Sequence, residues 1–443
     1  MAADPGPSAV KPRPQRLVEA HRPAAPPPRG PFRREFWRSP LRGPWLTSFL
    51  GMLLLPSVSV IALTGFISHW AYRPQLPGNA TVNPAYDLPA LIQLPQSWPS
   101  WDYAVTQGVH VTLGLMVIPL VAAKLWSVIP RLFTWPPARN LAGVLERGSM
   151  LLLVGSLLVE FVTGTLWVQD YFPLKIDFYP VHYYGAWVFG TMFVLHACIK
   201  LPVVRRAYRE RGVLAPLRQS LADTTPEPPG TSRLVPVDPA APTLSRRGLL
   251  AMIGGASLTV FVVQAGESIG GPFRRFALLA PRGRVLGTGA NAFEVNHTAI
   301  AAGVTRAINS PGWRLTVIGS RTLSLSRAQL LQMGQVTETL TISCTEGWST
   351  TQHWTGVRLL DLAGLADVPA GANLHAASLQ DGGPNAHASI GYAQWSDPRA
   401  LLALRVNGEE LSADHGYPAR VILSGSPGLY NTKWVRELRF EAA

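Results

Sequence analysis

The sequence predicts a multidomain protein: an all-α membrane bundle of four helices with a fifth anchoring helix, followed by an α+β domain. Three observations support this fold class. Five apolar runs, each near the ~20 residues that cross a bilayer as a helix, lie between residues 45 and 265. Positively charged side chains concentrate beside these runs. After about residue 273, the apolar residues recur instead in short alternating segments.

The composition is typical of a membrane protein and argues against nucleic-acid binding. Only 15% of the 443 residues are charged and 47% are hydrophobic, with a net charge of +13. Such a charge can attract nucleic acid, but here it flanks apolar runs and lacks interleaved aromatic residues. We therefore expect no nucleic-acid partner. The two cysteines, Cys198 and Cys344, lie in segments too different to pair, so they assign no compartment.

Residues 1–44 are rich in Pro, Ala and Arg and poor in large apolar side chains. They cannot bury a core, so we expect a disordered cytoplasmic arm. A cleavable signal peptide is not expected, because no apolar core follows a short basic start.

Residues 45–203 are expected to form the four-helix membrane domain. Its apolar runs are 45–69, 104–128, 148–168 and 181–203. Arginines lie between the second and third runs and after the fourth, whereas the other two connections carry few basic residues. Under the positive-inside rule, the N-terminus is cytoplasmic and the chain after the fifth helix is extracytoplasmic. This predicts a five-helix, multi-pass protein of the plasma membrane, in contact with lipid.

The chain between the bundle and the C-terminal domain carries a linker and an export motif. Residues 204–245 are basic and then rich in Pro, Thr and Ala, which predicts a flexible cytoplasmic linker. Ser245-Arg246-Arg247-Gly248 opens the fifth helix, 246–266, and is similar to a twin-arginine export signal placed inside the chain. Ordinary positive-inside flanking also explains one Arg-Arg pair. No cleavage pattern follows, so we expect the helix to remain as an anchor.

Residues 273–443 are expected to form an α+β domain with its own core. Alternating residues predict strands at 313–318, 338–343, 419–423 and 435–440, and helices are predicted at 326–333 and 359–365.

Cys344 is the strongest candidate for chemistry in this domain. It follows the alternating residues Leu340-Thr341-Ile342, which places it at the end of a strand, and a thiolate is a soft donor that suits a transition metal. A free cysteine is most often a small buried hydrophobe, and spacing alone favours that interpretation. The residues that follow Cys344 instead favour a metal ligand. Cys344-Thr345-Glu346-Gly347-Trp348-Ser349 is followed by Trp354-Thr355-Gly356-Val357.

Three stretches in order resemble the sulfite oxidase family of molybdopterin enzymes, most closely its periplasmic methionine sulfoxide reductase branch. They are the cysteine motif, Asn296-His297, and His415-Gly416-Tyr417-Pro418-Ala419-Arg420-Val421 followed by Gly428 and Lys433-Trp434. The resemblance covers roughly residues 285–443. It implies a molybdenum-molybdopterin cofactor, with Cys344 as the catalytic thiolate on the metal. It also implies that Asn296, His297, Arg420 and Lys433 hold the pterin and its phosphate, which requires cations and backbone donors.

A pterin inserted in the cytoplasm requires export of a folded protein. The twin-arginine translocation machinery provides that route, and the general secretory route does not. The resemblance therefore favours an export role for Arg246-Arg247, with that machinery as a partner.

Histidines in the apolar runs are candidate haem ligands, because ionisable residues inside a membrane are costly and usually functional. His182 and His196 are 14 residues apart (196 − 182), on one helix face and about 21 Å apart along it. This region resembles the cytochrome b561-like subunits of bacterial formate dehydrogenases and hydrogenases. The resemblance implies that His110 and His182 bind an outer haem b. It pairs His196 with a histidine near residues 42–45, where none is present, so His196 is equally a ligand or a structural residue. His69 is expected to be interfacial.

These features predict a membrane-anchored molybdopterin oxidoreductase that exchanges electrons between the quinone pool, a b-type haem and an extracytoplasmic small molecule. Reduction of an S- or N-oxide is favoured over sulfite oxidation. Ser349, Val295 and Tyr430 stand where sulfite oxidases place arginines, and a small dianion needs cations. The alternative is a haem b quinone-linked reductase whose outer domain is a cofactor-free binding module.

Overall fold

The computed structural model describes residues 30–87, 102–135, 140–169, 171, 177–229, 232–383 and 385–442. Contacts divide the chain into two compact units. The first contains residues 1–58, 117–162 and 181–258, and the second contains residues 59–116, 163–180 and 259–443. The unit boundaries fall within long helices, so each of these helices contributes to both units. Most of the predicted arm, residues 1–29, lies outside the described residues.

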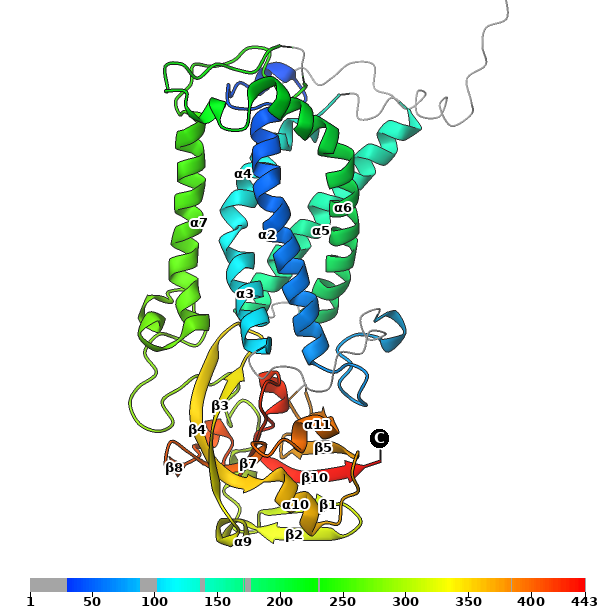
Figure 1. The fold of residues 1–443 in the computed structure, drawn as a ribbon, viewed down its shortest axis with the longest axis vertical. Coiled ribbons are helices and arrows are strands. Elements are labelled where there is room, and N and C mark those ends of the chain that lie inside the picture. The colour runs from blue at the N-terminus through cyan, green and yellow to red at the C-terminus, as the bar shows by residue number, and fades with distance from the viewer. Residues whose placement is uncertain are drawn as a thin grey trace, which may run out of the picture. The chain divides into compact units, whose positions relative to one another are not determined.

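Long helices form where the apolar runs predict them (Figure 1). They are α2 (Pro44–Ala71), α3 (Asp102–Met116), α4 (Ile118–Val128), α5 (Leu141–Val168), α6 (Phe178–Arg211) and α7 (Arg246–Ile269). Short 3₁₀ turns accompany them: η1 (Arg34–Phe36), η2 (Pro84–Tyr86), η4 (Ile129–Arg131), η5 (Ala215–Leu217) and η6 (Gly271–Phe276).

Within the described ranges, α2, α5, α6 and α7 are long and apolar enough to cross a membrane. The pair formed by α3 and α4 bends by 42°, and it is a fifth crossing if the two helices form one span. Pro119 stands in the first turn of α4 and has no N–H to continue the hydrogen bonds of α3, which accounts for the bend.

Large apolar side chains on these helices are exposed to the surroundings. Examples are Leu63 on α2, Leu145 on α5, Val194 on α6, and Met252 and Leu258 on α7. Water-soluble bundles turn such residues inward, whereas a helix in lipid presents them to the acyl chains. The exposed surface therefore agrees with the predicted membrane runs.

The segment 204–245 differs from the flexible linker that its composition predicts. Helix α6 continues as far as Arg211, and Leu234 and Val235 are buried. Leu217 packs against the buried cluster around Trp45 at the start of α2. Apolar side chains spaced among the prolines provide this packing. The overall composition of the segment does not reveal them, because they are few.

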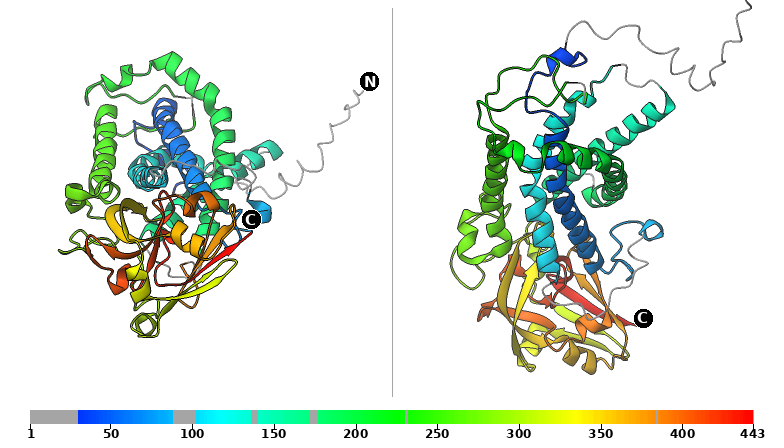
Figure 2. Two further views of the ribbon diagram at one scale, coloured as in Figure 1. Left: turned by 60° about the horizontal axis from the view of Figure 1, so that its bottom comes forward. Right: turned by 45° about the horizontal axis from the view of Figure 1, so that its top comes forward.

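The C-terminal part contains two β-sheets (Figures 1 and 2). The first has the strand order β2-β1-β10-β5-β6, with β1 and β10 parallel and the other neighbours antiparallel. Its strands are β1 (Arg314–Ile318), β2 (Thr322–Ser326), β5 (Asn373–Ser378), β6 (His387–Ile390) and β10 (Val435–Glu441). The second sheet is antiparallel, with the order β3-β4-β7-β8, and β9 also pairs with β7.

The strands of the second sheet are β3 (Val336–Ser343), β4 (Ser349–Arg358), β7 (Leu401–Val406), β8 (Glu409–Glu410) and β9 (Arg420–Ile422). Short helices join the strands of this region: α8 (Thr305–Ile308), α9 (Arg327–Gln332), α10 (Leu359–Leu365), α11 (Tyr392–Trp395), η7 (Ala413–His415) and η8 (Gly428–Tyr430).

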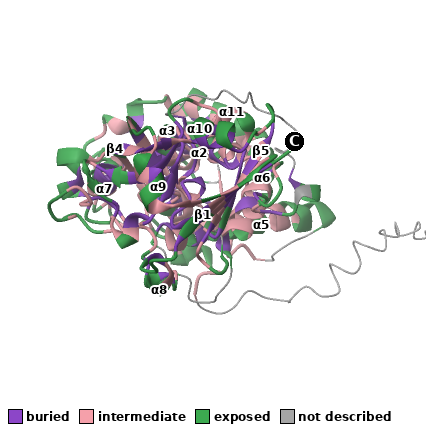
Figure 3. Cartoon of the chain, turned by 90° about the horizontal axis from the view of Figure 1, so that it is seen from below, coloured by how far each residue is buried: buried purple, intermediate pink, exposed green. Residues whose placement is uncertain are grey.

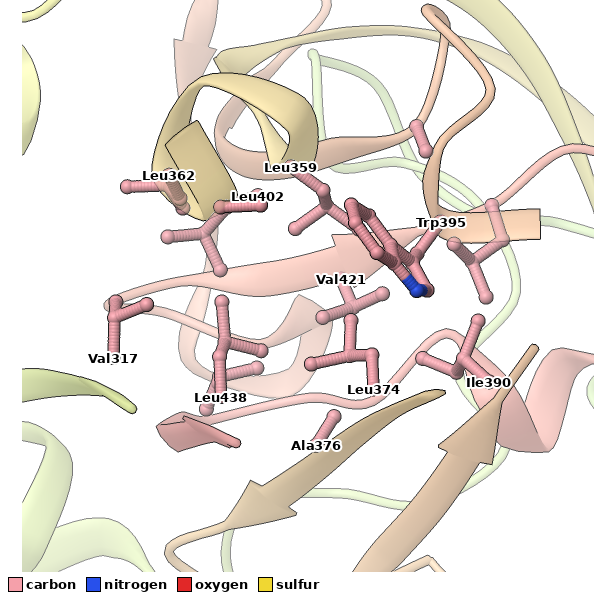
Figure 4. Packing of buried hydrophobic residues seen from close by; sticks show 14 of the residues in the cluster. Val317, Leu359, Leu362, Leu374, Ala376, Ile390, Trp395, Leu402, Val421 and Leu438 are labelled. Carbon is pink, nitrogen blue, oxygen red and sulfur yellow. The ribbon is translucent and has the colours of Figure 1, made fainter. Parts of the chain in front are cut away.

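The main core of the C-terminal part lies between the two sheets. Leu374 and Leu438 of the first sheet face Leu402 and Val421 of the second, and Leu359 of α10 closes one side (Figure 4). Buried residues run through these strands, and exposed residues lie at the periphery (Figure 3). This core includes residues of β9 and β10, and a second buried cluster around Trp354 includes Leu340 and Ile342 of β3. The ends of these strands carry the candidate site.

Candidate active site

Cys344 lies in the tight loop between β3 and β4. The Cys344 N–H donates to the Trp348 carbonyl at 2.9 Å, and the Gly347 N–H donates to the Cys344 carbonyl at 3.1 Å. Gly347 has a φ of +97°, which residues with a Cβ rarely adopt. The loop therefore fixes a thiol that is 7% exposed at the end of a strand, where the sequence predicts it.

Glu346 is a fixed carboxylate in the same loop. It is buried, forms an ion pair with Arg282, and accepts a hydrogen bond from the Trp348 indole at 2.7 Å. Burial and the negative charge of Glu346 raise the pKa of the Cys344 thiol. A thiolate here therefore needs a bound cation to stabilise its charge, which a metal ion provides.

Arg420 and Lys433 form a buried cationic pair. Arg420 is 4% exposed and donates to the His415 carbonyl, while Lys433 is 9% exposed and donates to the carbonyls of His297 and Asp414, each at 2.8 Å. Neither cation forms an ion pair with a carboxylate in the described part of the chain. Burial lowers the pKa of Arg420 to about 9 and lowers that of Lys433 as well. Two buried cations held by carbonyl oxygens attract an anion such as a phosphate.

His415 adds an acceptor to this group. Its ring stacks on Phe293 with 3.7 Å between centroids, and its Nε2 lies 3.0 Å from the Asn291 carbonyl, so Nε2 is the donor. Burial and the charges of Arg420 and Lys433 lower the pKa of His415 to about 3, so the ring is neutral. Its buried Nδ1 has no hydrogen-bond partner among the described residues. Such an acceptor is expected to face a donor on a ligand, and a pterin ring carries N–H groups.

The structure brings the predicted pterin residues close to the predicted metal ligand. Lys433 joins the C-terminal stretch, residues 415–434, to His297. Gly428 of this stretch packs against Cys344, where an added Cβ would lie 3.8 Å from the Cys344 Cα. Ser343, the residue before Cys344, forms an isolated β-bridge with Pro427. This bridge holds the cysteine loop, residues 344–348, beside the C-terminal stretch. Asn296 is half-buried next to His297, and its contact with a pterin stays a prediction.

Sequence reasoning missed the residues of α3 and α7 that hold the cysteine loop. The Gln107 amide donates to the Thr345 carbonyl at 2.7 Å, and the Ser268 hydroxyl donates to the Gly347 carbonyl at 2.7 Å. Val111 packs against Gly347, where an added Cβ would lie about 3.0 Å from the valine side chain. Gln107 is a polar amide inside a predicted membrane run, and that was the only signal of its role in the sequence.

The two histidines predicted to bind the outer haem each have Nδ1 near an oxygen. His110 Nδ1 donates to the Ile61 carbonyl at 2.9 Å, and its ring fills the space above Gly65, 2.7 Å from where a Cβ would lie. His182 Nδ1 lies 3.4 Å from a Glu160 carboxylate oxygen. An N–H donated from Nδ1 leaves Nε2 as the acceptor, which is the tautomer that binds iron.

The other two membrane histidines differ from this arrangement. His196 is half-buried on α6 and makes no hydrogen bond within the residues that the structure describes. His69, predicted to be interfacial, is only 3% exposed, and its depth in a membrane stays a prediction. Its Nε2 lies 3.0 Å from the Asp87 carboxylate and its Nδ1 lies 2.7 Å from the Tyr179 hydroxyl. Both ring nitrogens therefore have protein partners near the C-terminal end of α2.

Comparison with known proteins identifies the C-terminal part. Residues 301–443 match the family of the oxidoreductase molybdopterin binding domain. This part of the chain is a molybdopterin-binding oxidoreductase domain. Human mitochondrial sulfite oxidase is 34% identical over 134 residues, which are 29% of this chain and 24% of that protein. NADH nitrate reductase of Volvox carteri is 35% identical over 101 residues, which are 20% of this chain and 12% of that protein.

Among solved structures, the sulfane dehydrogenase SoxCD of Paracoccus pantotrophus is similar at 27% identity, with a TM-score of 0.28. The match covers 30% of this chain and 39% of that one. The chain therefore spans less than half the length of each of these relatives. Asn296 and His297 precede the matched range, whereas Cys344, Arg420 and Lys433 lie within it.

The residues present fit a molybdopterin. The molybdopterin-binding domain provides one buried thiol for a metal, two buried cations without a carboxylate partner for a phosphate, and one unfilled ring nitrogen for a pterin N–H. The protein is thus an oxidoreductase by its domain, and the cofactor-free alternative for the outer part is disfavoured.

Proposed function

We propose that this protein is a membrane-anchored molybdopterin oxidoreductase that passes electrons from the quinone pool, through a b-type haem, to an extracytoplasmic S- or N-oxide. The observation that carries the proposal is that the stretch holding Arg420 and Lys433 packs against the Cys344 loop inside a molybdopterin-binding domain. In the described part of the chain, four helices that suit a bilayer precede this domain, or five spans if α3 and α4 form one.

Each residue of the site has a separate task. Bound molybdenum-molybdopterin supplies two-electron chemistry at an oxygen atom. Cys344 ligates the metal as a thiolate, while Arg420 and Lys433 hold the phosphate of the pterin. The neutral Nδ1 of His415 accepts a pterin N–H. The Arg282–Glu346 ion pair fixes the loop, so it would hold the Cys344 thiolate in position on a bound metal.

His110 and His182 are the proposed ligands of the b-type haem, which carries single electrons between the quinone and the outer domain. The support is the oxygen atom on each Nδ1, since metal-bound histidines usually have such a partner. His196 has no oxygen that orients its ring among the described residues, so we assign the iron to the other two.

A neutral oxide suits the site better than a dianion. Tyr430 is buried and its hydroxyl donates to the Tyr72 carbonyl, and the Ser349 hydroxyl donates to Ser343 at 2.9 Å, so neither position supplies a cation. Sulfite oxidation is the second candidate. One observation favours it: human mitochondrial sulfite oxidase is 34% identical over 134 residues.

The proposed location is the plasma membrane, with a cytoplasmic N-terminus and an extracytoplasmic C-terminal domain. The asymmetry of arginines along the chain supports the orientation, and the exposed apolar side chains of the helices support contact with lipid. The twin-arginine machinery is the proposed route of export for the domain with its cofactor.

Analysis of the purified protein tests the proposal directly. We expect molybdenum, pterin and haem b together in the detergent-solubilised wild type, and reduction of methionine sulfoxide with reduced viologen as the electron donor. Cys344→Ser should keep the haem spectrum but lose the thiolate–molybdenum absorption and turnover. The matched control is Cys198→Ser, which removes the other, exposed cysteine and should change neither.

Full turnover in Cys344→Ser would refute the assignment of the metal ligand. Haem without molybdenum or pterin would instead support the binding-module alternative. Sulfite-dependent reduction of ferricyanide, with no turnover of oxides, would favour the second candidate.

A further inference from the structure

One face of α3 lies along the cysteine loop. Tyr103, Gln107 and Val111 are each four residues apart, so their side chains share a face of the helix. Gln107 bonds the carbonyl of the residue after Cys344, and Val111 packs on Gly347. These two contacts align α3 with the cysteine loop. They place Tyr103 near the end of the loop at which Cys344 lies. Residues of α3 also contact β3, the strand that ends just before Cys344.

Tyr103 is deeply buried, and the hydrogen-bonding capacity of its hydroxyl is only partly satisfied. Tyr103 is 1% exposed and Tyr72 is 4% exposed, and their hydroxyl oxygens are 2.9 Å apart. The two hydroxyls share one hydrogen bond, which uses one of their two protons. The Tyr430 hydroxyl donates to the Tyr72 carbonyl. No acceptor among the described residues takes the second proton, and a buried O–H without an acceptor is unfavourable.

Resting on the proposed function, we propose that Tyr103 is an active-site residue whose phenol O–H binds the oxygen atom of an S- or N-oxide substrate. Tyr72 orients this phenol by donating the shared hydrogen bond to the Tyr103 oxygen, which leaves the Tyr103 proton for the substrate. Tyr103 lies outside the matched domain of residues 301–443, so a membrane helix completes the substrate site.

A phenol is a suitable group for this substrate class. The oxygen of a sulfoxide or an N-oxide carries a large partial negative charge but belongs to a neutral molecule. A neutral O–H donor meets that charge, whereas a free cation would also attract sulfite and other small anions. A buried donor held in place before substrate arrives needs no reorganisation when the substrate binds.

Tyr103→Phe tests the assignment because it removes the hydroxyl and keeps the ring. We expect a loss of roughly 10–100-fold in kcat/KM for methionine sulfoxide, measured with reduced viologen so that the haem is not required. The matched control is Tyr179→Phe. Tyr179 belongs to the same aromatic cluster, with its ring 5.9 Å from that of Tyr72, but its hydroxyl faces His69 Nδ1. This control should keep the wild-type value.

Substrate binding provides a readout that does not depend on turnover. The oxidised enzyme cannot reduce dimethyl sulfoxide, so titration against the thiolate–molybdenum absorption gives a Kd alone. We expect this Kd to weaken in Tyr103→Phe by a factor similar to the loss in kcat/KM, and to stay unchanged in Tyr179→Phe. A purely structural role for Tyr103 would lower the molybdenum content or the melting temperature and leave the Kd of the loaded fraction unchanged.

If Tyr103→Phe fails to hold molybdenum, 3-fluorotyrosine at position 103 serves instead. It keeps the packing and makes the phenol a stronger donor, so the Kd for dimethyl sulfoxide should tighten. An unchanged Kd in a loaded variant overturns the role of Tyr103 and leaves the proposed function intact. A wild-type enzyme that holds molybdenum but neither binds nor reduces oxides overturns the proposed substrate class, and this assignment with it.

Discussion

At the residue scale, burial of charge decides the character of the site. Arg420 and Lys433 are cations in a place where water cannot stabilise them, which is why their pKa values are lowered. Among the described residues they donate to carbonyl oxygens and contact tryptophan rings but form no ion pair, so an anion that binds here recovers part of the free-energy cost of their burial. A third cation at His415 would increase the cost, and the ring stays neutral. The site is therefore prepared for an anionic cofactor before that cofactor arrives.

The neutral state of His415 predicts how acid affects the C-terminal domain. Its pKa is about 3 in the folded chain, against roughly 6.5 in an unfolded chain. Between these values the unfolded chain binds a proton that the folded chain does not. The stability from His415 is full above pH 6.5 and falls as the pH drops towards 3, by about 2 kcal/mol between pH 6.5 and 5.

Amide hydrogen exchange of β9 and β10 at pH 6.5 and pH 5 measures this loss, after correction for the intrinsic exchange rate. We expect His415→Phe to lose less protection than the wild type over this interval. His387→Gln, an exposed substitution on β6, is the control and should follow the wild type. An equal loss in His415→Phe and wild type would show that other groups cause the acid sensitivity.

At the element scale, the sequence predicts the elements whose pattern is regular. The long helices follow from apolar runs of membrane length, and β1, β3, β9 and β10 follow from alternation. Strand β7 was missed because it is buried on both faces, so its residues do not alternate. The break between α3 and α4 was missed because Pro119 is surrounded by apolar residues and does not interrupt the run.

The residues of the candidate site also fall into two groups: those that a local sequence pattern predicts and those that it does not. The resemblance of local motifs supplies Cys344, Arg420 and Lys433, since each stands in a short stretch with a fixed order of residues. Gln107 and Tyr103 have no such neighbours. Gln107 bonds a loop 238 positions away in the chain, and only the folded structure brings the two together. Contacts of this kind depend on how whole elements pack, so a local pattern does not predict them.

Haem binding is a prediction at the element scale, because it depends on pairs of helices. His110→Ala and His182→Ala should each remove most of the haem band from the reduced-minus-oxidised spectrum. Gly65→Val should have a similar effect, since a side chain on α2 would occupy the place of the His110 ring. His69→Gln is the matched control, because His69 is already engaged by Asp87 and Tyr179. An unchanged haem band in His110→Ala or His182→Ala removes that residue from the site.

At the scale of the whole molecule, the chain joins helices that suit a bilayer to a domain that carries a large cofactor. Under the proposed export, this domain folds around its cofactor before it crosses the membrane. The structure adds a second role for the arginine pair at the start of α7. Arg246 is buried and donates to the Gln219 side chain at 3.1 Å and to the Thr225 carbonyl at 2.9 Å, whereas Arg247 is exposed.

The two arginines consequently allow export to be separated from structure. Arg246→Lys removes a guanidinium that holds the segment before α7, so loss of export in that variant has two explanations. Arg247→Lys keeps the charge, the orientation of the helix and all contacts of Arg246, and it removes only a guanidinium that a twin-arginine receptor recognises. We expect Arg247→Lys to leave the C-terminal domain in the cytoplasm, protected from protease added outside the cell. Arg218→Lys, at another exposed arginine before the helix, should be exported like the wild type. Normal export of Arg247→Lys would mean that the pair only sets topology, and the inference that the pterin is loaded before crossing would lose its support.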